Sequence, residues 1–364
     1  MSLSKIEVHN VRNIRSVSLQ LSSRINLFYG QNGSGKTSLL EAVHLLGLGR
    51  SFRGVKPGPV INHDADDCTV FGQVTEPQGS SRSLGIVRGR DGSRLIHMGG
   101  DPVQRLSELA KVLPLQLINT ESIRLLTGRP DIRRRFLNWG VFHVEPGFHN
   151  AWKSTQHCLK QRNALLRDAK IDRSQLDLWT RELVAVCQDI DQYRASYIAR
   201  LDPLFQQLLS KLIKIRGFSL TYYRGWDGLT DLCDVLVESI EMDVKRGYTL
   251  NGPQRADLRV LMDRRDAVDV LSRGEMKMVA CALMIAQAQL FQQSAAGDCV
   301  FLVDDLSSEL DSAHREQLCN LLTDSNHQIL VTNIEKEDMT EIWPSGELAL
   351  FHVEHGEISN QERK

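Results

Sequence analysis

Hydrophobic and polar residues near the start of the chain follow a pattern that predicts strands and then a helix. Residues 6–8 are a short strand candidate, residues 16–21 alternate polar and apolar side chains, and residues 25–29 form the apolar run of a buried strand. From residue 38 to 48, apolar side chains recur at helical spacing on one face. A glycine-rich stretch separates this helix from the strand before it, so we expect strand, loop and helix in succession.

Short apolar runs after this helix predict an antiparallel β-meander. They occupy residues 68–74, 83–88 and 94–98, and Asp91-Gly92 between the last two is a hairpin turn signal. A further buried strand is predicted at residues 115–118.

The middle of the chain has the spacing of helices. Residues 146–216 form a helical stretch, with breaks predicted at 171–173 and at 202–203, where Asp precedes Pro. A strand at 218–223 and a helix over 227–245 are predicted next. We interpret this segment as a helical lobe inserted between two parts of a sheet domain.

The last third of the chain returns to alternating helices and strands. A helix is predicted over residues 275–293, strands at 300–303 and 328–331, and a helix after Asp311 between the two strands. The chain as a whole is therefore predicted to be α/β, with a mixed sheet, flanking helices and an antiparallel β-meander, and with an inserted, mostly α-helical lobe.

The length of 364 residues predicts two domains, a head of residues 1–125 and 247–364 and an inserted lobe of residues 126–246. No apolar run approaches the ~20 residues that cross a bilayer, and the N-terminus lacks the layout of a signal peptide. These features predict a cytoplasmic protein with no membrane segment. The seven cysteines include no Cys-x-x-Cys pair, which argues against a zinc ribbon or a disulfide framework.

The formal net charge is −1, whereas dedicated nucleic-acid binders usually carry a basic excess. Any contact with DNA would therefore depend on local basic clusters. The candidates are Arg50, Arg53, Lys56 and the run Arg133, Arg134 and Arg135. An arginine run is also typical of a solvated helix face, and this alternative stays open.

Candidate chemistry is concentrated in the glycine-rich stretch, which matches the phosphate-loop pattern of Gly, four residues and Gly-Lys-Ser/Thr. Its residues are Gly30, Gln31, Asn32, Gly33, Ser34, Gly35, Lys36 and Thr37. Glycines let successive backbone N–H groups turn inward toward phosphate oxygens, and the helix N-terminus adds partial positive charge. Lys36 is expected to reach the β- and γ-phosphates of a nucleoside triphosphate, and Thr37 to offer its hydroxyl to Mg²⁺.

A phosphate loop also needs a carboxylate from a distant part of the chain on the side of the Mg²⁺ ion. This carboxylate is usually found at the end of an apolar strand. Asp304 and Asp305 follow the predicted strand at residues 300–303. Asp304 is the expected metal-side residue, and Asp305 is placed to polarise the attacking water. Taken alone, such a pair is also typical of aspartates that cap the turn after a buried strand.

The stretch Ser272-Arg273-Gly274-Glu275 begins an apolar-faced helix. One interpretation is a capping box, with Ser272 as the N-cap and Glu275 three residues later. The other is that Ser272 and the helix N-terminus bind a γ-phosphate held by a second copy of the protein. The second is favoured by the order of motifs along the chain, namely phosphate loop, inserted lobe, Ser-x-Gly-Glu, and strand with Asp-Asp.

This order resembles that of the ATP-binding-cassette (ABC) ATPases. The stretch from Ser272 to Glu275 is similar to their signature motif, and Ser308-Glu309-Leu310-Asp311 is similar to their D-loop. Within that class, the chain resembles the RecF family of bacterial recombination mediators, in the SMC-like branch. The stretches that carry this resemblance are residues 11–14, 49–53 and 252–257, the Ser-Arg-Gly signature, and Asp304-Asp305 with residues 308–311. The resemblance implies an ABC-type P-loop ATPase head.

The resemblance also implies a role for single residues in the ATP site. Arg12 and Asn13 would lie beside the phosphates or the base of ATP, and Thr37 with Asp304 would hold Mg²⁺. Asp305 would be the hydrolytic carboxylate, acting with Lys36 in catalysis.

Three residues would complete the site of a partner subunit: Ser272, Gly274 and Glu275. Two positions depart from the usual pattern of these families. Asp305 stands where many ABC ATPases have Glu, which predicts slow hydrolysis because the shorter side chain lies farther from the water. Glu275 stands where RecF-like signatures usually have Gln.

The function that the resemblance implies is ATP-dependent DNA binding in recombinational repair and replication. ATP would drive a homodimer that binds gapped DNA at single-strand/double-strand junctions, helps RecR and RecO to load RecA, and supports the SOS response. ATP would act mainly as a dimerisation switch, with weak DNA-stimulated hydrolysis. The alternatives are an SMC-like or transporter-type ABC ATPase subunit with another partner, and a P-loop phosphotransferase, which would need an acceptor pocket.

Overall fold

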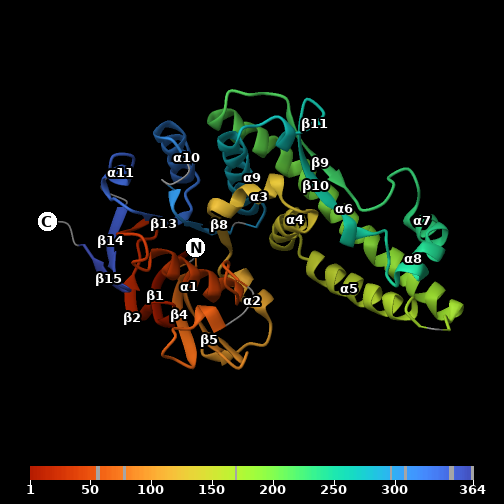
Figure 1. Cartoon of the computed structure of the whole chain (residues 1–364), viewed down its shortest axis with the longest axis horizontal. Helices are drawn as coiled ribbons and strands as arrows, with labels where there is room; N and C mark the ends of the chain where they lie inside the picture. Colours follow the sequence, from red (N-terminus) through yellow and green to blue (C-terminus); the bar gives the residue numbers. More distant parts are fainter. Residues whose placement is uncertain are drawn as a thin grey trace. The chain divides into compact units, whose positions relative to one another are not determined.

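The computed structural model describes residues 1–54, 58–76, 79–168, 170–295, 297–306, 310–343 and 348–361. The chain divides into two units, one of residues 1–122 and 281–364 (unit 1) and the other of residues 123–280 (unit 2). Among the described residues, unit 1 contains two six-stranded sheets, whereas unit 2 contains a three-stranded sheet and most of the long helices (Figure 1).

The first sheet of unit 1 has the strand order β2-β1-β4-β5-β6-β7, and neighbouring strands are antiparallel. Its strands are β1 (Ser2–Val11), β2 (Ile14–Gln20), β4 (Asp67–Thr75), β5 (Ser81–Gly89), β6 (Arg94–Met98) and β7 (Asp101–Pro102). Alternate side chains of β4 and β5 are buried on one face, as half-buried strands require. The predicted meander is thereby confirmed.

The second sheet of unit 1 has the order β15-β14-β3-β13-β12-β8 and is parallel except for its β14–β15 edge. Its strands are β3 (Ile25–Tyr29), β8 (Leu115–Ile118), β12 (Val300–Val303), β13 (Gln328–Asn333), β14 (Leu348–Glu354) and β15 (Glu357–Asn360). Every residue of β12 and β13 is buried, which explains the continuous apolar run of β12 and the apolar residues 329–331 within β13. The predictions for β3, β8, β12 and β13 are confirmed, whereas β14 and β15 were not predicted.

Helix α1 (Lys36–Leu48) contacts strands of both sheets in unit 1, namely β1, β4 and β5 of the first and β8 and β13 of the second (Figure 1). Eleven of its residues are buried, so this helix is part of one core that includes side chains from both sheets. The remaining helices assigned to unit 1 are α2 (Leu106–Val112), α10 (Ser312–Asp324) and α11 (Glu337–Thr340). Because α1 is packed into this core, the glycine-rich loop that precedes α1 is attached to a well-packed helix.

Unit 2 is built around the antiparallel pair of long helices α5 and α6 and the sheet β11-β10-β9. Its helices are α3 (Arg124–Thr127), α4 (Pro130–Val144), α5 (Phe148–Leu165), α6 (Arg173–Leu212), α7 (Leu232–Glu238) and α8 (Ile240–Arg246), and its strands are β9 (Phe218–Tyr223), β10 (Asp257–Met262) and β11 (Arg265–Asp266). The predicted helix over 227–245 is instead two helices, which meet at Ser239. Helix α9 (Arg273–Ala295) begins in unit 2 and continues into unit 1. Within the described part of the chain, no helix combines the length and hydropathy needed to span a bilayer.

The predicted break at residues 202–203 is wrong, because α6 continues through Pro203 for a total of 40 residues. At 1.5 Å per residue this helix is about 60 Å long. Proline removes one backbone hydrogen bond, but Tyr197 and Phe205 are fully buried on either side of it, and the Asp202 carboxylate accepts a 2.9 Å hydrogen bond from the Leu220 N–H. Tertiary packing therefore outweighs the local preference for a break.

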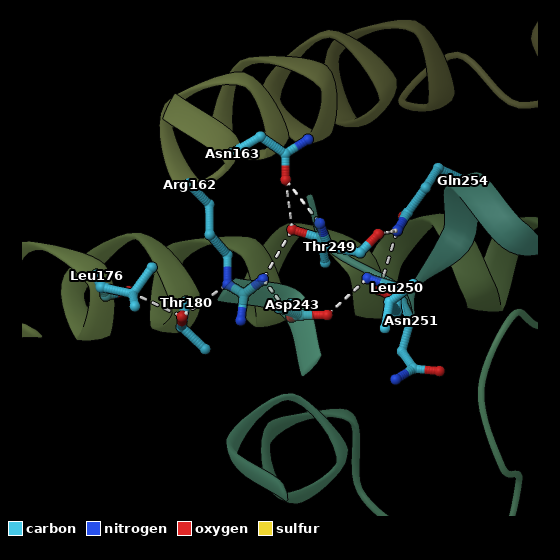
Figure 2. A network of polar contacts seen from close by, with 9 residues as sticks. All are labelled: Arg162, Asn163, Leu176, Thr180, Asp243, Thr249, Leu250, Asn251 and Gln254. Carbon is cyan, nitrogen blue, oxygen red and sulfur yellow. Dashed lines mark hydrogen bonds and ion pairs between the residues drawn. The ribbon is translucent and has the colours of Figure 1, made fainter. Parts of the chain in front are cut away.

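A buried ion pair holds the end of α5 to α8 and to the segment that follows α8 (Figure 2). Arg162 Nη1 donates to Asp243 Oδ2 over 2.7 Å, and both side chains are fully buried. The same nitrogen donates to Thr249 Oγ1 over 2.7 Å, and Arg162 Nε donates to Thr180 Oγ1 over 3.0 Å. Asp243 Oδ1 accepts from the Leu250 N–H over 2.9 Å, so one carboxylate ties together three parts of unit 2.

Replacing Asp243 by Asn should lower the free energy of unfolding by about 3 kcal/mol, because the buried Arg162 guanidinium would lose its counter-charge. Denaturant unfolding followed by circular dichroism measures this loss. Glu241→Gln, at an exposed position on the same helix, is the matched control and should stay within about 0.5 kcal/mol of the parent. Equal effects of the two substitutions would contradict a stabilising role for the buried pair.

Candidate functional site

An open cavity of about 650 Å³ lies where β3, β12 and β13 end in unit 1. Ligands of open α/β sheets typically bind at the carboxyl ends of parallel strands. The cavity is lined by Arg12, Asn13, Arg15, Asn32, Gly33, Gly35, Lys36, Thr37, Ser38, Arg53, Pro59, Ile61, Asn62, His63, Asp304, Asp305 and Thr332. The structure thus brings the glycine loop and the aspartate pair together.

The glycine loop has a backbone that only glycine adopts readily. Gly30 has φ +150°, and a Cβ atom there would lie 2.1 Å from the carbonyl oxygen of Val353. Gly35, at the N-cap of α1, has φ +123°. A side chain at either position would force the loop to change shape, which explains the glycines of the motif.

Lys36 bends back into the curve of the loop. Its Nζ donates hydrogen bonds to the carbonyl oxygens of Gly30 (2.6 Å) and Gln31 (2.9 Å). Burial lowers the pKa of Lys36, while the charges of Asp305 and Asp304 act in the opposite direction. The lysine is therefore close to both carboxylates and to the carbonyl groups that shape the loop.

Asn13 supports the loop from outside. Its Nδ2 donates to the carbonyl oxygens of Ser34 (3.1 Å) and Gly33 (3.3 Å), and its Oδ1 accepts from Ser38 Oγ over 2.8 Å. This residue was expected beside the phosphates or base of a nucleotide. Its side-chain contacts are with the loop backbone and the first turn of α1, so it braces the loop.

Arg12 lines the same cavity and is tied to α1. Its Nε and Nη2 donate to the two carboxylate oxygens of Glu41 over 2.9 and 2.8 Å, and the Glu41 side chain is fully buried. Arg12 has φ +55°, an uncommon value for a residue with a side chain. The bidentate pair fixes the plane of the guanidinium at the edge of the cavity.

Asp304 is the centre of a second set of polar contacts in the cavity. Its Oδ1 accepts from Thr37 Oγ1 and from Thr332 Oγ1, each over 2.9 Å, although Thr37 is 267 residues away in the chain. Thr332 Oγ1 also accepts from the N–H of Asp305, which has φ +55°. Burial raises the pKa of Asp304; the hydrogen bonds from Thr332 and Thr37 and the charge of Arg53 oppose this, and Asp305 adds to it.

This donor set fits Mg²⁺, which prefers hydroxyl, carboxylate and phosphate oxygens and keeps several waters. Thr37 and Asp304 present a hydroxyl and a carboxylate oxygen in direct contact. A cation beside Asp304 would stabilise the charge that burial disfavours. No group of three or more His, Cys, Asp or Glu side chains forms a metal cluster in the residues described, and a Mg²⁺ site that uses phosphate oxygens does not need one.

Ser272 and Glu275 form the capping box at the start of α9. The N–H and Oγ of Ser272 donate to Glu275 Oε2 over 2.8 and 2.6 Å, and the Glu275 N–H lies 3.4 Å from Ser272 Oγ. The first interpretation of this stretch is therefore confirmed. Ser272 and Gly274 are exposed, so the same helix N-terminus is open to a second molecule.

The arginine run is neither a free cluster nor a uniformly solvated face. Arg133 donates to both carboxylate oxygens of Asp257 over 2.7 and 2.8 Å, and Arg134 Nη1 donates to the carbonyl of Ala256 over 2.9 Å. Arg135 is exposed beside Asp131. Arg133 and Arg134 are thus structural residues of unit 2, which the sequence could not indicate because their partners lie more than 120 residues away.

The other candidate residues lie on the loop after α1 or outside the described residues. Arg50 and Arg53 are exposed on the loop after α1, and Arg53 lines the cavity. Lys56, Ser308 and Glu309 lie outside the described residues.

Two residues of the site, Thr332 and Glu41, were not predicted. Thr332 directly follows a predicted strand, and the structure pairs Val303 with Val331 in parallel, so the residues that follow the two strands lie side by side. Glu41 carries no such signal, because a glutamate in a helix is ordinarily a surface residue.

Comparison with known proteins gives a consistent result. Residues 2–359 match the family model for the RecF/RecN/SMC N-terminal domain. The chain is 49% identical over 360 residues to the DNA replication and repair protein RecF of Pseudomonas syringae pv. syringae (strain B728a), covering 99% of this chain and 98% of that protein. With the RecF of Stutzerimonas stutzeri (strain A1501) it shares 50% identity over 362 residues, covering 99% and 97%.

Solved structures show the same fold at lower identity. The recombination mediator protein RecF with ATP, described in the RecFOR pathway, superposes with a TM-score of 0.88 at 23% identity and covers 99% of this chain and 98% of that one. An SMC head bound to the C-terminal winged-helix domain of ScpA gives a TM-score of 0.60 at 13% identity, with coverage of 99% and 98%. The predicted ABC-type ATPase head is confirmed by these likenesses.

Proposed function

The chain belongs to the RecF family of SMC-like ABC ATPases, whose members act in DNA replication and repair, and on that basis we propose that it is an ATP-dependent DNA-binding protein of recombinational repair. The observation that carries the proposal is the hydrogen bond between Thr37 and Asp304, which joins the end of the glycine loop to the strand-terminal carboxylate. This pairing is what a phosphate-loop nucleotide site requires.

In the proposed site, residues 30–37 hold the phosphates of ATP through backbone N–H groups, and Lys36 turns from the loop carbonyls toward the β- and γ-phosphates. Thr37 and Asp304 hold Mg²⁺, which supplies positive charge to the phosphate oxygens when bound. Thr332 keeps the Asp304 carboxylate in place and positions the backbone of Asp305.

Asp305 is the proposed group that orients and deprotonates the attacking water. Its backbone is held by Thr332, but its side chain is one methylene shorter than glutamate. Because catalysis depends on placement to within about 1 Å, we expect slow hydrolysis. ATP then serves mainly to hold a conformational state rather than to drive rapid turnover.

The proposed state is a homodimer in which each subunit supplies Ser272 and Gly274 to the nucleotide of the other. Their exposure at the N-terminus of α9 supports this role, because helix N-termini favour anions. Glu275 already accepts from Ser272 Oγ, so the serine would have to exchange this partner for a phosphate oxygen. The dimer would bind gapped DNA at single-strand/double-strand junctions, act with RecR and RecO in loading RecA, and support the SOS response.

The proposal is tested by measuring oligomeric state and ATP turnover on the same samples, with and without gapped DNA. We expect a monomer without nucleotide, a dimer with ATP, and slow turnover that gapped DNA stimulates. Turnover that requires a small-molecule acceptor would support the phosphotransferase alternative. ATP-dependent dimerisation with no response to DNA would favour an ABC subunit with another partner.

A further inference from the structure

The two units of the chain carry opposite net charge, although the chain as a whole is close to neutral. Residues 123–280 contain 26 Lys and Arg residues and 20 Asp and Glu residues, so unit 2 has a formal net charge of +6. Since the total is −1, the remaining residues carry −7. The neutral total therefore conceals a basic unit, and a basic surface region is typical of nucleic-acid binders.

Five cationic side chains of unit 2 come from two segments that lie side by side. One segment is the end of α6 with its connection to β9, and the other is the hairpin between β10 and β11 (Figure 1). Phe218 pairs with Met262 in the sheet, and the Asp263 N–H donates to the Gly217 carbonyl oxygen over 3.0 Å. We call the following residues the unit 2 basic patch: Lys211, Lys214, Arg216, Arg264 and Arg265.

All five side chains of the unit 2 basic patch are exposed, and none of them forms a hydrogen bond or an ion pair with another described residue. Two acidic residues adjoin the patch in sequence. The Asp263 carboxylate packs against Gly217, where a Cβ atom would lie 2.3 Å from Asp263 Oδ1. Asp266 lines a cavity of about 270 Å³ together with Arg133 and Arg259. The patch thus keeps an excess of positive charge, and its donors are available to an anion.

The backbone of the hairpin turn gives a second reason to assign a function to Arg264. Met262 pairs with Arg265, so the turn consists of Asp263 and Arg264, and their φ values are +47° and +68°. Turns with positive φ at both positions favour glycine at the second one, because a side chain there costs conformational free energy. Arg264 thus stands where glycine would suit the backbone, and residues held in such a conformation are typical of functional sites.

We propose that the unit 2 basic patch binds the phosphate backbone of DNA. The inference rests on the proposed function and names the surface that the DNA contacts. Lys and Arg side chains neutralise phosphates without reading bases, so the contact is independent of sequence. An acidic protein segment fits the patch less well, because protein interfaces usually have an apolar core and no large apolar side chain of residues 211–217 or 263–266 is exposed.

The patch is connected to the proposed dimer contact by a short stretch of chain. Strand β11 is followed by one turn of 3₁₀ helix, η4 (Ala267–Asp269), and then by Ser272 at the start of α9. DNA bound at the hairpin therefore contacts a segment that leads directly to the proposed phosphate-capping residues. Loss of the patch should remove the stimulation of ATP turnover by DNA and leave basal turnover unchanged.

Arg264→Gly distinguishes a role in DNA binding from a role in stability. With ATP present, we expect about fivefold weaker binding of a fluorescein-labelled gapped duplex at about 0.1 M salt, and a slope of log Kd against log salt that is smaller by about 0.9. The unfolding temperature should not fall below that of the parent, because glycine suits the turn. Arg173→Ala, which removes an exposed charge at the other end of α6, is the control and should change neither DNA affinity nor slope.

The segment after α6 is tested with the double substitution Lys214→Ala/Arg216→Ala. Two lost phosphate contacts should weaken DNA binding roughly 25-fold and lower the salt slope by about 1.8. Adding Arg264→Gly should lower the slope by about 0.9 more, because the three side chains contact different phosphates. Affinity for a fluorescent ATP analogue and ATP-dependent dimerisation should match the parent in every variant.

Unchanged DNA affinity and salt slope in these variants would overturn the inference and would favour an acidic protein segment as the ligand of the patch. Weaker binding with an unchanged slope would also overturn it, because the loss would then not come from phosphate contacts. The proposed function fails separately, if the parent protein binds no gapped DNA. If the parent binds gapped DNA and the variants bind it equally well, only the role of the patch is refuted.

Discussion

Replacing Asp304 by Asn should reduce ATP turnover roughly 10³-fold, because the amide keeps the shape of the carboxylate but lacks the charge that holds the metal ion. Thr37 and Thr332 both donate to Asp304 Oδ1, and an asparagine oxygen can accept from both. The hydrogen bonds from Thr37 and Thr332 should therefore remain, while metal binding and hydrolysis are lost. The turnover of the variant relative to the parent is obtained from steady-state phosphate release, measured with and without gapped DNA.

The fold of this variant is expected to remain intact. Burial disfavours the ionised form of Asp304, as its raised pKa indicates, so a neutral amide at this position should not lower the unfolding temperature. Asp324→Asn, an equivalent change at an exposed position at the end of α10, is the control and should leave turnover unchanged. Turnover of Asp304→Asn within tenfold of the parent would exclude Asp304 as the metal-side carboxylate.

Ser272→Arg should abolish ATP-dependent dimerisation while ATP binding to the monomer is retained. Ser272 is exposed at the start of α9, so a long cationic side chain there can be accommodated in one subunit but would occupy the space of the partner's phosphates. Loss of the cap should cost about 1 kcal/mol, which is too little to unfold the chain. Multi-angle light scattering with and without ATP measures the effect.

Ser272→Thr is the matched control, because it keeps a hydroxyl that can form the capping box with Glu275. It should dimerise with ATP as the parent does. A Ser272→Arg protein that binds ATP and still dimerises would refute the composite site. A protein that no longer binds ATP at all would show instead that Ser272 acts within its own subunit.

The sequence predicted the parts of the site that depend on local chemistry. The glycine loop follows from residue types at fixed spacing, and Asp304 follows from a carboxylate at the end of an apolar strand. In the structure the glycine loop and Asp304 lie together because β3 and β12 both run parallel to β13 and end at the same edge of the sheet. Thr332 obeys the same rule and was overlooked because threonine carries no charge that marks it as a candidate.

Predictions failed where a distant partner decides the outcome. Arg133 and Arg134 resemble a basic patch in sequence, but Asp257 and Ala256 accept their hydrogen bonds. Pro203 predicts a helix break, but burial of the residues around it keeps α6 continuous. In each case a long-range contact outweighs a local preference, and no single-sequence pattern reports such contacts.

The position of β3 in its sheet has a consequence for the order of assembly on the ribosome. Ile25 of β3 pairs with Ile329 of β13 on one side and with Leu348 of β14 on the other. During synthesis β3 is made early, whereas its neighbours β13 and β14 are made roughly tens of seconds later. Unit 2, which is one continuous segment, can fold in the meantime. The nascent N-terminal segment is thus exposed to chaperones and proteases until the last strands emerge.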